Sequence, residues 1–114
     1  MSDCIFCKIV AGQIDSQKVF EDDQCVAFDD VNPQAPVHTL VIPKQHVSSL
    51  EEIPSEKTTL MGHLLQVCRI VAKKKNVETN GYRVVINTGV EGGQTVSHLH
   101  LHVLGGRPMT WPPG

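Results

Sequence analysis

Three histidines stand at every second position of the segment VSHLHLHVLGG, which runs from residue 96 to residue 106. These histidines are His98, His100 and His102. Successive side chains of a β-strand point to opposite faces of its sheet, so the spacing predicts three imidazoles on one face. The apolar residues that alternate with them are Leu99, Leu101 and Val103. These can enter a hydrophobic core from the opposite face, which fixes the register of the strand.

A row of imidazoles has more than one interpretation. It can be a solvated sheet face, although threonine, lysine or glutamate fill that role more commonly. It can be a histidine-rich metal-binding tract, a metal centre, or a set of nucleophilic and acid–base groups. Imidazole suits the last two roles because its unperturbed pKa is about 6.5. Three charged rings would repel one another, so at least one should stay neutral at pH 7.

Length and charge limit the class of protein. The chain has 114 residues, the size of one domain, with ten basic and twelve acidic side chains and a net charge of −2. This balance argues against a broad nucleic-acid surface but allows one small anionic ligand. No apolar run reaches the roughly 18 residues of a membrane span, and the N-terminus lacks the pattern of a signal peptide. We therefore expect a cytoplasmic protein with reduced thiols rather than a disulfide framework.

One long helix is predicted over residues 55–76, with Ser55 as its N-cap. Its apolar stripe consists of Leu60, Met61, Leu64, Leu65, Cys68, Val71 and Ala72. The lysines at 73–75 are interpreted as a solvated helix end in preference to a phosphate site, since positive charge suits that end of the helix dipole. His63 matches no motif and should be a partly exposed helix residue. Cys25 and Cys68 have apolar neighbours and should be buried thiols.

The remaining elements are mostly strands. A short helix is expected over 5–11, two short strands on either side of the acidic turn 21–24, and further strands over 37–43 and 81–89. Together with the histidine strand, they predict an α+β fold with a mostly antiparallel sheet, one long helix and one short helix.

A glycine-rich loop, GVEGGQTVS, leads into the histidine strand. Glycines let backbone N–H groups approach an anion, and the polar side chains of Gln94, Thr95 and Ser97 add donors. The loop lacks the Gly-Lys-Ser/Thr ending of a P-loop. By itself it is more typical of a tight turn, but beside three aligned imidazoles it suggests a phosphate cradle.

The chain resembles the histidine triad (HIT) family over nearly its whole length. The segments that carry the resemblance are CIFCKIVAGQI, VFEDDQCVAFDDVNPQAPVHTLVIPKQHV, INTGVEGGQTV and HLHLHVLGGRPMTWPPG. The closing GGRPMTWPPG is more specific than the triad and is similar to the nucleotide-binding Hint branch. The resemblance implies a single HIT domain over 1–114 that forms homodimers. It also implies an enzyme that binds purine nucleoside monophosphates and hydrolyses bonds at the α-phosphorus, notably phosphoramidates.

The resemblance also implies roles for individual residues. His100 is the nucleophile: one ring nitrogen attacks phosphorus, a backbone carbonyl holds the other N–H, and water resolves the nucleotidyl-histidine. His102, Gln94 and Thr95 meet the charge on the phosphoryl oxygens. Thr95 stands where many Hint members have serine, and it keeps the hydroxyl. His38, in APVHTL, tunes the protonation of the triad.

Further positions complete the implied nucleotide site. Asn87 and the Gly93 backbone match phosphate or leaving-group contacts, and Asp30 matches the acceptor for the ribose hydroxyls. Phe28 and Val31 match the walls of the base pocket. Phe28 alone would be an ordinary core residue, and only the joint match indicates a binding role.

The N-terminal pair Cys4 and Cys7 forms a Cys-x-x-Cys motif with three interpretations. A redox motif would lie in a βαβ unit, which the sequence does not show. Two inert thiols, or half of a zinc site without zinc-finger spacing, are the others. Bacterial-type HIT proteins with this pair use two distant ligands, which match His46 in PKQH and His98. The resemblance therefore implies a structural zinc site that takes His98 out of acid–base chemistry, while catalysis itself needs no metal.

Three functions remain open. The first is a nucleoside phosphoramidase. The second is a dinucleoside polyphosphate hydrolase, which the Trp-Pro-Pro-Gly ending disfavours. In Hint members this tail reaches the partner's active site, so Trp111 is expected to shape the choice of leaving group. The third is a non-catalytic nucleotide-binding or zinc-dependent interaction protein, which would have no need of a nucleophile at position 100.

Overall fold

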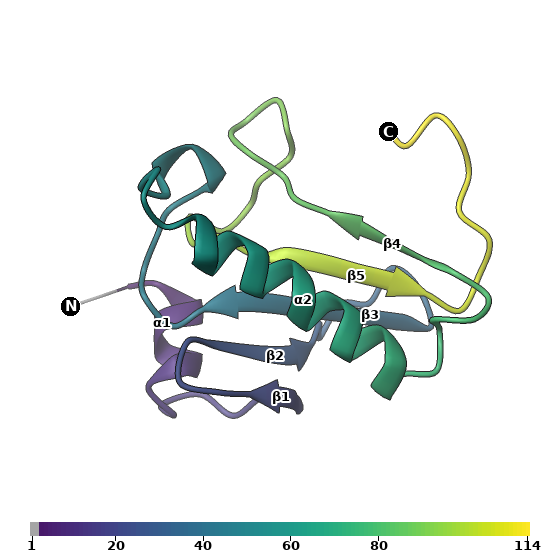
Figure 1. Cartoon of the computed structure of the whole chain (residues 1–114), viewed down its shortest axis with the longest axis horizontal. Coiled ribbons are helices and arrows are strands. Elements are labelled where there is room, and N and C mark those ends of the chain that lie inside the picture. The colour runs from purple at the N-terminus through teal and green to yellow at the C-terminus, as the bar shows by residue number, and fades with distance from the viewer. Residues whose placement is uncertain (1–2) are drawn as a thin grey trace.

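The structure, a computed structural model, describes residues 3–114. Within them, five strands form one antiparallel sheet in the order β1-β2-β3-β5-β4 (Figure 1). The strands are β1 (Lys18–Glu21), β2 (Cys25–Asp29), β3 (Val37–Pro43), β4 (Tyr82–Val85) and β5 (Leu101–Gly105). The helices are α1 (Ile5–Val10), the single 3₁₀ turn η1 (Leu50–Glu52) and α2 (Thr58–Lys74). The predicted α+β fold with an antiparallel sheet is confirmed.

The long helix α2 covers one face of the sheet (Figure 1). It contributes Leu64, Val67, Cys68, Val71 and Ala72 as buried residues. They pack against the strand residues Cys25, Ala27, Val41, Leu101 and Val103 and against Leu99, which precedes β5. The expected stripe is confirmed at Leu64, Cys68, Val71 and Ala72, but Leu65 is 50% exposed, and the stripe omitted Val67, which is 0% exposed. The buried thiols expected at Cys25 and Cys68 are confirmed, at 0% and 1% exposure.

The short helix α1 covers part of the opposite face. Phe6 and Ile9 are its buried residues, and they pack with Val26, Phe28, Leu40 and Ile42 of the central strands. The aromatic rings of Phe6 and Phe28 meet edge to face, with centroids 5.6 Å apart. The sheet is therefore buried on both faces, and the histidines lie on the face that carries α1.

The N-terminal boundary predicted for the long helix is wrong. The helix begins at Thr58, and its N-cap is Lys57, which makes no side-chain capping hydrogen bond. The Lys57 N–H donates to the carbonyl oxygen of Pro54 at 2.9 Å. Ser55 therefore lies inside a tight turn that ends where the helix begins, and it cannot cap the helix.

At its other end, α2 closes through a left-handed residue. Asn76 has φ 61°, and the Val77 N–H donates back to the carbonyl oxygen of Ala72 at 2.9 Å. Lys73 and Lys74 are exposed, as expected for a solvated helix end. Lys75 is different, because its Nζ lies 2.9 Å from Oδ1 of Asp29 on β2.

The two C-terminal strands are shorter than predicted. β4 ends at Val85 rather than at residue 89, because its last partner on β5 is His102. β5 itself begins only at Leu101, so His98 and His100 precede the hydrogen-bonded strand. Their alternation with the leucines persists all the same, since the Leu99 N–H is held by the carbonyl oxygen of Val47 at 2.7 Å.

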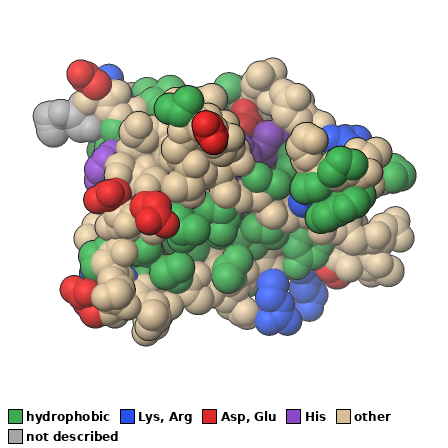
Figure 2. Space-filling view, turned by 90° about the horizontal axis from the view of Figure 1, so that it is seen from above, with side chains coloured by type: hydrophobic (Ala, Val, Ile, Leu, Met, Phe, Trp, Pro, Cys, Tyr) green, Lys and Arg blue, Asp and Glu red, His purple; other side chains and the backbone are tan. Residues whose placement is uncertain are grey.

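The β4 strand forms one edge of the sheet (Figure 1). Its residues are half-buried along their whole length. Figure 2, seen from above relative to Figure 1, shows hydrophobic side chains gathered over the middle of the face on that side. Among residues 3–114, no helix has the length and apolar character needed to cross a bilayer.

Candidate active site and metal site

A cavity of about 510 Å³ lies between α1 and the sheet. It brings together seven of the residues predicted for the nucleotide site: Phe28, Asp30, Val31, His38, Thr95, His100 and His102. Within the described part of the chain, its lining does not include Asn87, Gly93, Gln94, His98 or Trp111. Its lining combines apolar side chains of α1 and Leu40 with the imidazoles and Asp30.

His100 is held in a single orientation. Its Nδ1 lies 2.7 Å from the carbonyl oxygen of His98, and the residue is only 5% exposed. Because the carbonyl can only accept, Nδ1 carries the hydrogen, and in the neutral ring Nε2 keeps its lone pair. Phe6 packs edge to face on the ring, with centroids 5.2 Å apart. A neutral His100 thus has a nucleophilic nitrogen in a shielded setting.

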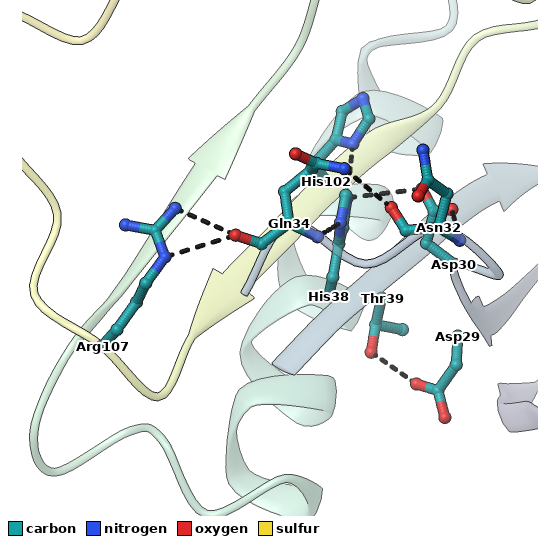
Figure 3. A network of polar contacts seen from close by, with 8 residues as sticks. All are labelled: Asp29, Asp30, Asn32, Gln34, His38, Thr39, His102 and Arg107. Atoms are coloured by element: carbon teal, nitrogen blue, oxygen red, sulfur yellow. Dashed lines mark hydrogen bonds and ion pairs between the residues drawn. The ribbon is translucent and has the colours of Figure 1, made fainter. Parts of the chain in front are cut away.

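His38 and His102 form a second polar pair, drawn in Figure 3. The backbone N–H of Gln34 donates to Nδ1 of His38 at 3.0 Å, so a neutral His38 carries its hydrogen on Nε2. That Nε2 lies 2.9 Å from Nδ1 of His102 and donates to it. A neutral His102 then carries its own hydrogen on Nε2, which has no partner among the described residues. The chain of bonds leaves one unpaired N–H donor on a ring that lines the cavity.

The electrostatics keep these rings neutral. Burial, with the neighbouring His100 and His38, lowers the pKa of His102 to about 4, although Asp30 acts in the opposite direction. Burial also lowers the pKa of His38 against the opposing effect of Asp30. Burial likewise lowers the pKa of His98. This agrees with the expectation that at least one triad imidazole is neutral at pH 7.

Asp30 lines the cavity and directly follows β2. Its Oδ1 accepts the N–H of Asn32 at 2.9 Å, and its Oδ2 lies 3.5 Å from Nε2 of His38 (Figure 3). Each oxygen retains acceptor capacity for a ligand hydroxyl. Phe28 is 4% exposed and forms both core and cavity wall, whereas Val31 is 99% exposed at the rim.

The glycine loop is closed largely by its own hydrogen bonds. The Gly93 N–H donates to the carbonyl of Val90 at 3.1 Å, and the Gln94 N–H to that of Gly89 at 3.0 Å. The Gln94 side chain donates to the carbonyls of Ser48 and Val96, at 2.7 and 3.0 Å. Gln94 therefore pins the loop to the preceding segment, and Thr95 is the predicted loop residue that reaches the cavity.

The predicted metal ligands converge at the N-terminus of α1. The cluster consists of Cys4, Cys7, His46 and His98, whose ligand atoms all lie within 4.8 Å of one another. His98 is 0% exposed and donates from Nε2 to the carbonyl of Pro43 at 2.9 Å. This bond leaves the Nδ1 lone pair directed at the cluster, the outer-shell arrangement typical of metal-binding histidines.

The distances in the cluster fit a tetrahedral ion. Nδ1 of His46 and Nδ1 of His98 are 3.1 Å apart, and Sγ of Cys7 lies 3.2 and 3.6 Å from them. Sγ of Cys4 lies 3.4 Å from Nδ1 of His98. Zinc bond lengths in tetrahedral geometry require edges of about 3.3 Å between nitrogens and about 3.6 Å between sulfur and nitrogen. Two thiols and two imidazoles are also a donor set that zinc prefers.

Sequence reasoning missed three residues of the site. Phe6 contacts the rings of both His98 and His100, although the sequence indicated it only as part of the CIFC segment. Gln34 acts through its backbone N–H, for which the sequence carries no signal. Ser16 lines the cavity with a buried hydroxyl that has no partner in the described chain.

Comparison with known proteins adds the family. The HIT domain model matches residues 11–109. An uncharacterized HIT-like protein of Synechococcus elongatus is 55% identical over 112 residues, which cover 98% of this chain and 97% of that protein. A protein of Zea mays named 14 kDa zinc-binding protein is 48% identical over 115 residues, covering 99% of this chain and 89% of that protein.

Solved structures of related proteins have the same fold. A HIT family hydrolase from Legionella pneumophila superposes with a TM-score of 0.95 at 45% identity, covering 98% of this chain and all of that one. A histidine triad nucleotide-binding protein from Candida albicans gives a TM-score of 0.83 at 34% identity, covering 96% of this chain and 83% of that one. With a family model spanning most of its length and relatives at this level of identity, the chain belongs to the HIT family.

Proposed function

We propose that this protein is a Hint-type purine nucleotide-binding hydrolase that cleaves nucleoside phosphoramidates through a covalent intermediate on His100. The observation that carries the proposal is the bond from Nδ1 of His100 to the carbonyl of His98, because it leaves Nε2 as the nucleophile on a ring that lines the cavity. The neighbours named for hydrolase activity and nucleotide binding support the class of ligand and of reaction.

The reaction takes place in two displacements. Nε2 of His100 donates its lone pair to the α-phosphorus, and the P–N bond to the amine breaks. The amine takes up a proton from solvent as it leaves, and the water that hydrolyses the phosphorus–histidine bond releases a proton to solvent, so the protons balance over the two steps. The products are a nucleoside monophosphate, an amine and neutral His100.

Charge on the phosphoryl oxygens is met by fixed donors. His102, whose buried Nε2–H has no partner in the described chain, lines the same cavity as His100, and so does Thr95, which carries a hydroxyl. Donors held in place before the reaction stabilise developing charge without reorganising. The roles of Asn87, Gly93 and Gln94 stay predictions, because the contacts within the loop leave fewer free donors than the sequence suggested.

The apolar and polar residues of the cavity lining suit the base and the sugar-phosphate of a nucleotide. Phe28, Leu40 and the α1 side chains offer apolar walls to a purine, and Asp30 offers acceptors to the ribose hydroxyls. In this arrangement the α-phosphate would reach His100, and the base would lie against the apolar side chains.

The cluster of two cysteines and two histidines would hold zinc as a structural ion. Bound there, zinc would fix α1 against the sheet by joining residues more than 90 positions apart in the chain. The proposed reaction does not involve the metal, because His98 does not line the cavity and His100 supplies the nucleophile. Elemental analysis of untagged protein, purified without added zinc, should find about one zinc per chain; a value near zero contradicts the site.

A homodimer is also part of the proposal. β4 is an edge strand with half-buried residues, and Leu65 on α2 is 50% exposed. A second copy is suited to cover both features. Trp111, at 82% exposure, lies outside the cavity of its own chain and would act on the partner's site. Light scattering coupled to size exclusion should give twice the chain mass, and Leu65→Glu should shift it toward the monomer.

The decisive assay uses adenosine 5′-phosphoramidate. The protein is mixed with excess substrate, quenched in alkali, and examined by mass spectrometry for adenylated chain and by chromatography for AMP. We expect adenylation at His100 and at least a 10³-fold loss of turnover in His100→Ala, in keeping with removal of a nucleophile. His63→Gln, which changes a histidine outside the cavity, is the matched control. Tight AMP binding without turnover would instead indicate a non-catalytic nucleotide-binding protein.

A further inference from the structure

The segment that follows β5 is fastened to the turn before β3. Arg107 donates from Nε and from Nη2 to one carbonyl oxygen, that of Gln34, at 3.2 and 3.1 Å (Figure 3). Its Nη1 donates to the carbonyl of Pro108 at 3.1 Å, so all three guanidinium nitrogens are engaged. This forked arrangement defines the direction of the Gln34 carbonyl more closely than a single donor would.

A second contact holds the same two segments together. Gly106 has φ 90°, and a Cβ built there would lie 2.8 Å from Cβ of Pro36. The chain therefore turns beside the 34–36 segment where only glycine fits. The Gln34 side chain also braces this segment, since its Nε2 donates to the carbonyl of Asn32 at 3.1 Å. Hydrogen bonds therefore hold both the backbone carbonyl and the side-chain amide of Gln34.

The position of the Gln34 N–H determines which ring nitrogen carries the hydrogen in His38 and in His102. The Gln34 N–H donates to Nδ1 of His38, which places the hydrogen of that neutral ring on Nε2. His38 then donates to Nδ1 of His102, which leaves His102 with a hydrogen on Nε2. Without the Gln34 N–H, the longer contact of His38 Nε2 with Asp30, at 3.5 Å, would be the remaining carboxylate contact favouring a hydrogen on Nε2. A hydrogen on Nδ1 of His38 would then become accessible, and His102 could carry its own hydrogen on Nδ1.

We propose that Arg107 is a positioning residue, which holds Gln34 so that its peptide N–H sets the tautomers of His38 and His102. The inference rests on the proposed function for its catalytic consequence, because an Nε2–H donor on His102 is what a phosphoryl oxygen requires. The tautomers are a property of the protein alone and can be measured without substrate.

The first test is spectroscopic. Long-range proton–nitrogen correlation spectra of the ¹⁵N-labelled protein at pH 7.5 distinguish Nδ1–H from Nε2–H imidazole. Native protein should show the Nε2–H form for both His38 and His102. Arg107→Met should show a mixture of tautomers at both rings, and Arg107→Lys, which restores one donor, should lie between the two. Single Nε2–H tautomers in Arg107→Met overturn the proposal.

Arg83 provides a matched control. It belongs to β4 and donates from Nη2 to the carbonyl of Thr110 at 2.8 Å, so it also holds the C-terminal segment but does not touch Gln34. Arg83→Met should leave both tautomers unchanged. A shift in this variant equal to that in Arg107→Met would overturn the specific role of Arg107, because any loosening of the tail would then suffice.

Gln34→Pro removes the N–H donor itself while Arg107 remains. It should release the tautomers as fully as Arg107→Met does, and combining the two changes should add nothing further. Should Gln34→Pro fail to fold, Gly106→Ala is the second variant, because it displaces the same segment through Pro36. Unchanged tautomers in both folded variants overturn the proposal.

Steady-state kinetics test whether the tautomers of His38 and His102 affect catalysis. With adenosine 5′-phosphoramidate, Arg107→Met should lower kcat about 5- to 30-fold with little change in KM, the size expected when one hydrogen-bonded donor is misplaced. If native protein shows no turnover, the proposed function fails while the tautomer result still decides the positioning role. If the tautomers shift and kcat does not, the link between positioning and catalysis is overturned.

Discussion

His98 and His100 share one hydrogen bond, yet their rings serve two different sites. The carbonyl oxygen of His98 accepts from Nδ1 of His100 at 2.7 Å. The His98 ring lies among the metal ligands, and the His100 ring lines the cavity. Whatever fixes the His98 ring therefore also fixes the backbone atom that orients His100. The candidate metal site and the proposed nucleophile are thus only two residues apart in the chain.

Titration of the His102 ring by NMR should give a pKa of about 4, as its burial beside two other imidazoles requires. This lies below the value of about 6.5 for the unfolded chain, so the unfolded state binds more protons between these values. The contribution of His102 to stability is then complete above about pH 6.5 and is lost as the pH falls toward 4. The difference in unfolding free energy between native protein and His102→Gln should change across this window. A measured pKa near 6.5 contradicts the buried, neutral ring.

Asp22→Asn should destabilise the protein at pH 7 by about 1–2 kcal/mol, measured by urea unfolding. Burial would raise the pKa of Asp22, but hydrogen bonds from the Gln24 N–H, His63 and the Cys25 N–H outweigh it and lower the pKa to about 2. Nε2 of His63 on α2 lies 2.6 Å from the carboxylate, so the pair fastens the helix to the β1–β2 turn. Because the pKa is lowered from 3.8, this stability is present above about pH 4 and is lost as the pH falls to 2.

The exposed neighbour of Asp22 is the control for this prediction. Asp23→Asn should change the unfolding free energy by less than about 0.5 kcal/mol, since surface substitutions away from such contacts have small effects. Equal losses in the two variants would show that the charge of the turn, and not the contact with His63, is responsible.

Removal of the metal should lower the melting temperature. Ligands brought together only by folding make metal binding part of the folding free energy. A strong zinc chelator should therefore lower Tm in calorimetry, and added zinc should restore it. In Cys7→Ser the chelator should have little further effect. Cys68→Ala, which creates a cavity beside α2, should melt at a lower temperature but keep its full sensitivity to the chelator.

Alanine substitution should have opposite effects at two glycines, Gly92 and Gly62. A Cβ at Gly92 would lie 2.3 Å from the Thr88 carbonyl oxygen, so Gly92→Ala should distort the loop before the triad and raise KM for the phosphoramidate. Gly62 lies within α2 with nothing near its Cβ position. Gly62→Ala should stabilise the protein by about 0.5–1 kcal/mol and leave turnover unchanged. Unaltered kinetics in Gly92→Ala would show that the loop does not shape the site.

Asp30 should recognise ribose. Asp30→Ala should raise KM for adenosine 5′-phosphoramidate by roughly tenfold, the usual effect of losing a charged hydrogen-bond partner. The substrate lacking both ribose hydroxyls should be poor for the native protein, and Asp30→Ala should lose nothing more with it. If the loss caused by Asp30→Ala and the loss caused by removing the ribose hydroxyls add together, Asp30 does not bind the ribose.

Periodicity predicted the elements that carry a strong pattern. The strand over 37–43 has the bounds of β3, and the alternation at 98–103 assigned the correct residues to each face. The metal ligands came from a resemblance and lie together as expected. The contacts that set the tautomers were not foreseen, because the N–H of Gln34 is a backbone group and Arg107 reaches it across 73 positions. Such contacts depend on where irregular segments meet, and no local pattern encodes that.

The alternation of histidine with leucine also constrains the spacing within the segment itself. Leu99, Leu101 and Val103 are each at most 2% exposed on the α2 side, while the histidines occupy the other side. Deleting or inserting one residue between His98 and His102 would direct some imidazoles into the apolar layer under α2 and turn the intervening leucines toward the cavity. Evolution of this segment can exchange side chains singly, but it can change the spacing only in steps of two.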